Sequence, residues 1–145
     1  MSLETIILII ILTLQAICLG VSLFWLSVIE TAFKSISNSS LFLELIAHIR
    51  LSAIQLMSVI FVMTLAGAII LNLIYHSRSE PYLLKIGLIS FISFLVLVLS
   101  KFIFLEESAI AINFPLINNL LLWGNLLCIT VSYWSFLHYA LNPKI

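Results

Sequence analysis

The stretch Leu51–Tyr75, LSAIQLMSVIFVMTLAGAIILNLIY, decides the fold because it holds 25 consecutive residues without a charged side chain. A helix rises about 1.5 Å per residue and the hydrocarbon layer of a bilayer is about 30 Å thick, so roughly 20 apolar residues cross it. We therefore predict a transmembrane helix here. The amphipathic approach at 41–50, with Glu44, His48 and Arg50, is expected to lie at the level of the lipid headgroups.

Further stretches of similar length lie on both sides of this one, at 5–29, 82–104 and 116–139. The stretch at 82–104 has the shortest uncharged centre, but Lys85 and Lys101 can extend their ammonium groups toward opposite headgroup layers. Short polar segments separate the stretches, so consecutive helices should be antiparallel neighbours. The predicted fold is all-α: one integral membrane domain, 1–145, that forms an up-down bundle of four transmembrane helices.

The composition excludes several classes of protein. Of the 145 residues, 63% are hydrophobic and 8% are charged, which is too little polar surface for a soluble globule. Six basic and six acidic residues cancel, so no basic surface for nucleic acid is expected. The bilayer itself, further copies of the chain or other membrane subunits are the expected partners.

The location follows from the spans and the orientation from the loop charges. A bacterial inner membrane or an organellar membrane is expected. Lysines and arginines number three on each side of the predicted topology, so they set no preference. The acidic residues break the tie weakly and favour both termini on the cytoplasmic, stromal or matrix side.

Small residues at helical spacing predict where the helices pack, because apolar spans associate in lipid through close backbone approach. In the first two spans these residues are Ala16, Gly20 and Gly67. In the last span Gly124, Cys128 and Ser132 recur every four residues and are expected to form one packing face.

Neutral polar residues deep in the spans are candidates for hydrogen bonds between helices or for a pore lining. They are Gln15, Gln55, Thr64, Asn72 and Asn125. An amide bonded across helices contributes about 1 kcal/mol, so the structural role is the first expectation. A neutral polar pore is the alternative.

Catalytic and cofactor signatures are missing from the sequence. Asp is absent, and neither GxSxG nor HExxH occurs, so we expect no enzyme, no metal ion and no cofactor. His76 and His138 are weak candidates for haem ligands, because both would lie on one membrane surface.

Short motifs resemble the YqhA-like family of small four-span membrane proteins from bacteria and plastids. They are LGVSL at 19–23, TLAG at 64–67, the Lys85-led third span, Leu122-Trp123, Thr130 and Phe136. The resemblance covers the chain from about Thr13 to Leu141 and implies four spans; the family's biochemical activity is not established. Val62 stands where the family has an acidic residue and Cys128 where it has a histidine, while His76–Ser79 replaces a Gly-Tyr-Glu-Asn turn.

These features favour a structural or assembly module, either a homo-oligomer or an accessory subunit of a larger membrane complex. The alternative is an oligomeric channel or transporter. A haem- or quinone-associated redox subunit is the third hypothesis.

Overall fold

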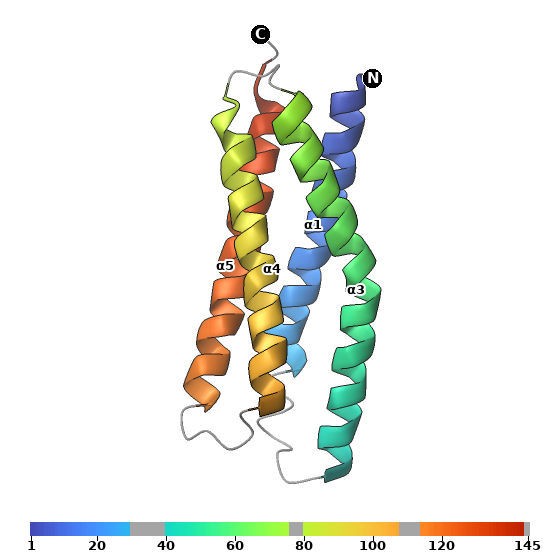
Figure 1. The fold of residues 1–145 in the computed structure, drawn as a ribbon, viewed down its shortest axis with the longest axis vertical. Helices are drawn as coiled ribbons and strands as arrows, with labels where there is room; N and C mark the ends of the chain where they lie inside the picture. Colours follow the sequence, from blue (N-terminus) through green and yellow to red (C-terminus); the bar gives the residue numbers. More distant parts are fainter. Residues whose placement is uncertain (30–39, 76–79, 108–113, 144–145) are drawn as a thin grey trace.

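The chain folds into a bundle of antiparallel helices, as predicted. The computed structural model describes residues 1–29, 40–75, 80–107 and 114–143. Within them lie α1 (Leu3–Phe24), its short π-helical continuation η1 (Trp25–Ile29), α3 (Ser40–Ile74), α4 (Tyr82–Glu107) and α5 (Phe114–Leu141). Successive long helices run in opposite directions, and both termini lie at the same end of the bundle (Figure 1).

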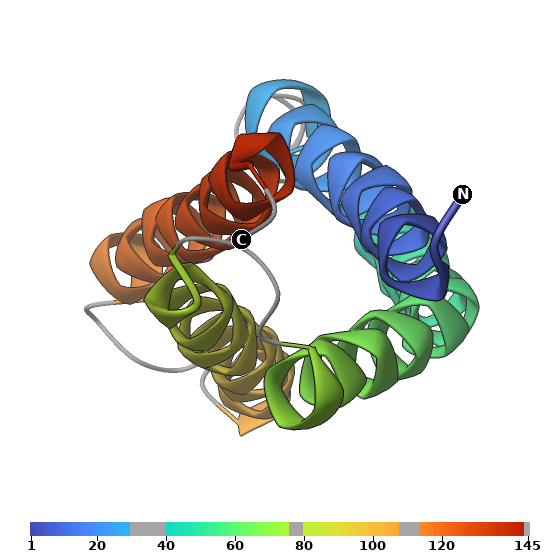
Figure 2. The same cartoon turned by 90° about the horizontal axis from the view of Figure 1, so that it is seen from above.

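The helices occupy the corners of a square when viewed along the bundle (Figure 2). α4 and α5 pack most extensively, while α1 packs against α3 and α5, and α3 also packs against α4. Each long helix therefore has two neighbours, and its inner edge faces a shared interior.

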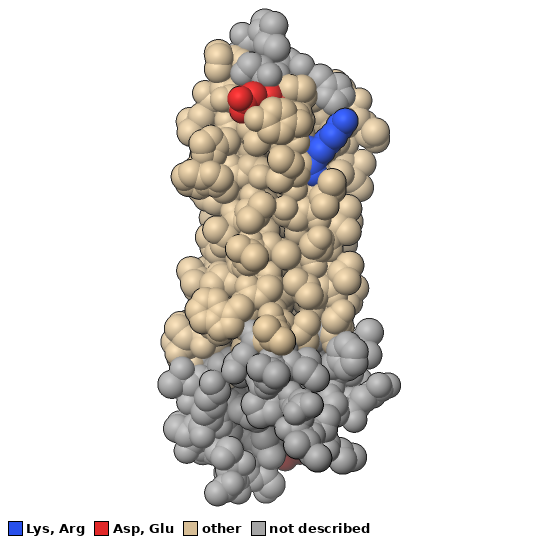
Figure 3. All heavy atoms as spheres, turned by 90° about the vertical axis from the view of Figure 1, so that its left-hand side faces the viewer, with Lys and Arg blue, Asp and Glu red and all other residues tan. Residues whose placement is uncertain are grey.

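Four helices among the described residues are long and apolar enough to span a bilayer: Leu3–Val28, Leu51–Ile74, Tyr82–Ser100 and Leu120–Leu141. Large apolar side chains cover their outer surface, such as Leu56 and Leu73, each 75% exposed. On the face shown in Figure 3, charged side chains lie near the upper end and a small acidic patch is visible at the lower end, while the described surface between them is uncharged. This surface is suited to lipid.

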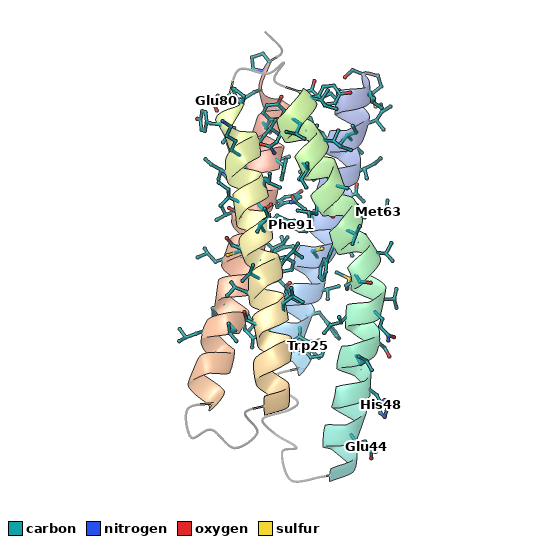
Figure 4. All side chains as sticks on the ribbon, viewed as in Figure 1. Trp25, Glu44, His48, Met63, Glu80 and Phe91 are labelled. Atoms are coloured by element: carbon teal, nitrogen blue, oxygen red, sulfur yellow. The ribbon has the colours of Figure 1, made fainter. Side chains whose placement is uncertain are left out.

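The second predicted span and its amphipathic approach form one continuous helix, α3. α3 has 35 residues, a length of about 52 Å at 1.5 Å per residue, which exceeds the hydrocarbon layer of about 30 Å. Figure 1 shows α3 continuing beyond the lower ends of the other helices. Glu44 and His48 lie on this extension and are exposed (Figure 4).

The helices on either side of the third polar segment extend farther into it than the predicted spans at 82–104 and 116–139. α4 continues through Glu107, and α5 already begins at Phe114 with Pro115 as its second residue. Proline is tolerated in the first turn of a helix because the N–H groups there have no intrahelical acceptor.

The interior contains two apolar cores. The first core, toward the termini, consists of Leu8, Ile11, Ala68, Leu71, Leu84, Phe136 and Tyr139. The second core, farther along the bundle, consists of Cys18, Phe91, Phe94 and Ile129. Phe91 is fully buried and points from α4 into the interior (Figure 4).

Candidate functional site

A layer of polar groups lies between the two apolar cores. Gln15 Nε2 on α1 donates to Ser132 Oγ on α5 at 2.7 Å. Ser132 Oγ in turn donates to the carbonyl oxygen of Gly87 on α4 at 2.8 Å. Gln15 and Ser132 are both 0% exposed. This hydrogen-bonded chain, here called the polar layer, joins three helices at the centre of the bundle.

The position of Gln15 in this layer follows from the spacing of buried residues along α1. These are Glu4, Leu8, Ile11, Gln15 and Cys18, with separations of four, three, four and three residues. This spacing keeps one edge of a helix facing the interior. Gln15 therefore occupies a core position that an apolar residue would ordinarily fill.

Two buried amide oxygens accept no hydrogen bond from the described residues: Gln15 Oε1 and Asn125 Oδ1. A buried polar atom without a partner costs about 1–3 kcal/mol. Asn125 is 7% exposed and lies seven residues before Ser132, so both face the interior from the same edge of α5. These two buried amide oxygens are therefore the feature of the bundle that most needs a further hydrogen-bond donor.

Asn72 joins α3 to α4 through a hydrogen bond. Its Nδ2 donates to the carbonyl oxygen of Ala68 in its own helix and to that of Leu84 in α4, each at 2.9 Å. Because Leu84 lies in the first core, this bond holds the two helices together beside packed apolar side chains.

α1 and α3 approach each other closely at Gly67. A methyl group at Gly67 would lie 3.0 Å from Ile11 Cδ1, so the glycine gives Ile11 room to pack against α3. Gly67 therefore lies on a helix-packing face, as predicted from the sequence.

Polar contacts also close the end of the bundle that bears the termini. Tyr139 Oη on α5 donates to Glu4 Oε1 on α1 at 2.9 Å, and both residues are buried. Beside them, Asn142 Nδ2 donates to Glu80 Oε2 at 3.2 Å. Aromatic residues near the end of a span usually lie at the membrane interface, but the ring of Tyr139 belongs to the first core.

The predicted packing face on α5 is turned toward other helices. Ser132 is in the polar layer, Cys128 packs against the second core, and a methyl group at Gly124 would lie 3.2 Å from Leu97 Cδ1. The expectation for α1 needs correction. Ala16 and Gly20 are exposed, and a methyl group at Gly20 would meet no atom within 4 Å. Both lie opposite the edge that Gln15 and Cys18 bury, so among the described residues they face away from the other helices.

The polar residues offered as a pore lining do not line one path. Gln55 is exposed on α3, so it cannot face the interior of a single chain. Thr64 is buried and donates to the carbonyl oxygen of Ile60 at 2.8 Å. Asn72 is engaged between α3 and α4, and Asn125 is separated from the polar layer by Ile129 of the second core.

The histidine pair offered for haem is only half described. His138 is exposed and its ring centroid lies 4.6 Å from that of Trp134, while His76 lies outside the described residues. Over residues 1–29, 40–75, 80–107 and 114–143, no group of three or more metal-ligating side chains could hold an ion.

Three residues that matter for this arrangement carried no clear signal in the sequence. Glu4 and Tyr139 lie near the ends of their helices, where polar and aromatic groups usually face headgroups. Gly87 was not among the predicted packing residues. A methyl group there would lie 2.7 Å from Phe136 Cε2. The heptad spacing of α1 could have revealed Glu4, but its partner depends on how the helices pair.

Comparison with known proteins gives no assignment. The chain matches no protein-family model, no curated protein and no solved structure.

Proposed function

We propose that this protein is a non-catalytic structural or assembly module of a bacterial inner membrane or an organellar membrane. It acts through its outer surface, as a homo-oligomer or as an accessory subunit of a larger complex. Its two termini share one side, for which we propose the cytoplasm, stroma or matrix.

The filled interior supports this role over passage through the bundle. Above the polar layer, Leu8, Leu84 and Tyr139 are 0–1% exposed, and below it Cys18, Phe91 and Ile129 are equally buried. These side chains come from helices on opposite sides of the interior, so apolar packing closes the axis on both sides of the polar groups.

The outward face of α1 is the observation that carries the proposal. Ala16 and Gly20 lie one turn apart and both are exposed, and the space above Gly20 is open. Small residues at this spacing let a second helix approach closely in lipid. Because both residues are exposed among the described helices, their face is available to another subunit.

Bulk added at Gly20 tests the proposal without disturbing the bundle. Gly20→Ile should weaken the assembly on native gels and in native mass spectrometry from mild detergent, because its side chain enters space that is open in one chain. Ala66→Ile is the matched control, since Ala66 is an exposed small residue on α3, and it should leave the assembly intact.

Two results would contradict the proposal. One is a wild-type protein that is strictly monomeric and carries no co-purifying subunit. The other is an assembly that Gly20→Ile leaves unchanged although the variant folds normally by circular dichroism.

A further inference from the structure

The orientation of the Gln15 amide follows from the hydrogen bonds of Ser132. A serine hydroxyl has one proton, and that of Ser132 is donated to the Gly87 carbonyl oxygen at 2.8 Å. The contact between Gln15 and Ser132 must therefore use an amide proton, which places Nε2 toward Ser132. Oε1 then points elsewhere in the interior, where no described side chain donates to it.

The antiparallel pairing of α1 and α3 places Thr64 near the level of Gln15. A methyl group at Gly67 would touch Ile11, so these two residues are level. Gln15 lies four residues onward along α1, about 6 Å, and Thr64 lies three residues backward along α3, about 4.5 Å, so the second pair is level to within about one residue. Gln15 and Thr64 are both 0% exposed, which places both in the interior.

Thr64 can only accept a hydrogen bond from the interior. Its hydroxyl proton is donated to the Ile60 carbonyl oxygen at 2.8 Å, but the lone pairs of Oγ1 remain available. Two acceptors, Gln15 Oε1 and Thr64 Oγ1, thus occupy the same level without a donor between them. A molecule that donates two hydrogen bonds would satisfy both.

We propose that a buried water molecule bridges Gln15 Oε1 and Thr64 Oγ1. Water is the smallest double donor, and buried waters in proteins characteristically bond polar groups that lack other partners. The first and second cores lie on either side of this level. The water extends the polar layer to α3, so that all four long helices meet in one hydrogen-bonded network.

Magic-angle-spinning NMR of the full chain in lipid bilayers tests the bridge. The side-chain amide protons of Gln15 should show a cross-peak to water at short mixing times. Ser132→Ala should retain this cross-peak, because the water is bound through Oε1 and not through the serine hydroxyl. If the cross-peak persists in Ser132→Ala, the magnetisation cannot have reached Gln15 from water through the Ser132 hydroxyl.

The deciding variant is Thr64→Val, which removes one of the two acceptors at nearly constant shape and should abolish the cross-peak. Thr130→Val is the matched control, because Thr130 Oγ1 likewise donates to a carbonyl oxygen of its own helix, that of Leu126, but is exposed on α5. It should leave the cross-peak unchanged. The proposal is overturned if wild-type Gln15 shows no cross-peak to water while the exposed Gln55 amide does, or if Thr64→Val retains the full signal. Should Thr64→Val fail to fold, the wild-type and Ser132→Ala spectra still decide.

Discussion

Gly87 lies where α4 comes closest to the ring of Phe136, and replacing it with alanine tests the packing of the bundle. The added methyl group would lie 2.7 Å from Cε2, 2.9 Å from Cδ2 and 3.0 Å from Cζ of Phe136. Phe136 is 0% exposed and belongs to the first core, so its ring has no open space to enter. Relief of the clash requires α4 and α5 to separate, which would also stretch the hydrogen bond from Ser132 to the Gly87 carbonyl oxygen.

Gly20, whose replacement by alanine causes no clash, serves as the reference for measuring the cost of the clash at Gly87. Gly20→Ala carries the same gain in helix propensity, about 1 kcal/mol, and its methyl group meets no atom within 4 Å. The propensity gain cancels between the two variants, so their difference isolates the clash. Overpacking a filled core costs about 1–3 kcal/mol. We therefore expect the free energy of unfolding of Gly87→Ala to be about 1–3 kcal/mol lower than that of Gly20→Ala.

The assay is unfolding of the purified protein by SDS in mixed micelles, followed by circular dichroism. Phe136→Leu in the Gly87→Ala background should restore part of the loss, with a coupling of at least about 0.5 kcal/mol between the two positions. Equal stability of Gly87→Ala and Gly20→Ala would refute the close packing of α4 against α5.

Further predictions concern the remaining contacts. Tyr139→Phe removes the donor to the buried Glu4 carboxyl group and should lower the free energy of unfolding by about 1.5–3 kcal/mol in the same assay; an unchanged value would show that this contact does not form. Asn72→Leu should cost about 0.6 kcal/mol and at most about 1.7, because it removes the bond to Leu84 across α3 and α4; Asn142→Leu, whose bond is only partly buried, should cost less. A small membrane-permeant maleimide should label Cys128, which is half-buried, and leave Cys18, which is 1% exposed, unlabelled until SDS unfolds the bundle. Equal labelling of both thiols before unfolding would contradict the assignment of Cys18 to the second core.

The spans could be predicted from sequence because long apolar runs in lipid must satisfy their own backbone hydrogen bonds by forming helices. α4 begins at Tyr82, as predicted, and α5 begins at Phe114, two residues earlier than predicted. The predicted span begins at Leu51, after the charged residues of the amphipathic approach, whereas α3 already begins at Ser40. Such residues do not interrupt a helix that extends beyond the bilayer.

The contacts that join the helices could not be predicted, because they depend on how distant segments pair. Gln15 and Ser132 lie 117 positions apart, and Glu4 and Tyr139 lie 135 apart. A polar residue in an apolar run shows that a partner is needed, but not which helix supplies it. For the same reason, spacing alone could not distinguish Gly67, which packs against Ile11, from Gly20, which faces outward.

The most direct test of the four-span bundle is to label single cysteines with a membrane-impermeant maleimide in sealed vesicles of known orientation. Cysteines would replace Ser2, Glu44 and Pro143 one at a time in a Cys18→Ala, Cys128→Ala background. Because both termini lie at one end of the bundle and Glu44 at the other (Figures 1 and 4), Ser2→Cys and Pro143→Cys should react from the same side, and Glu44→Cys from the opposite side. Labelling of Ser2→Cys and Pro143→Cys from opposite sides, or of all three from one side, would contradict the up-down bundle.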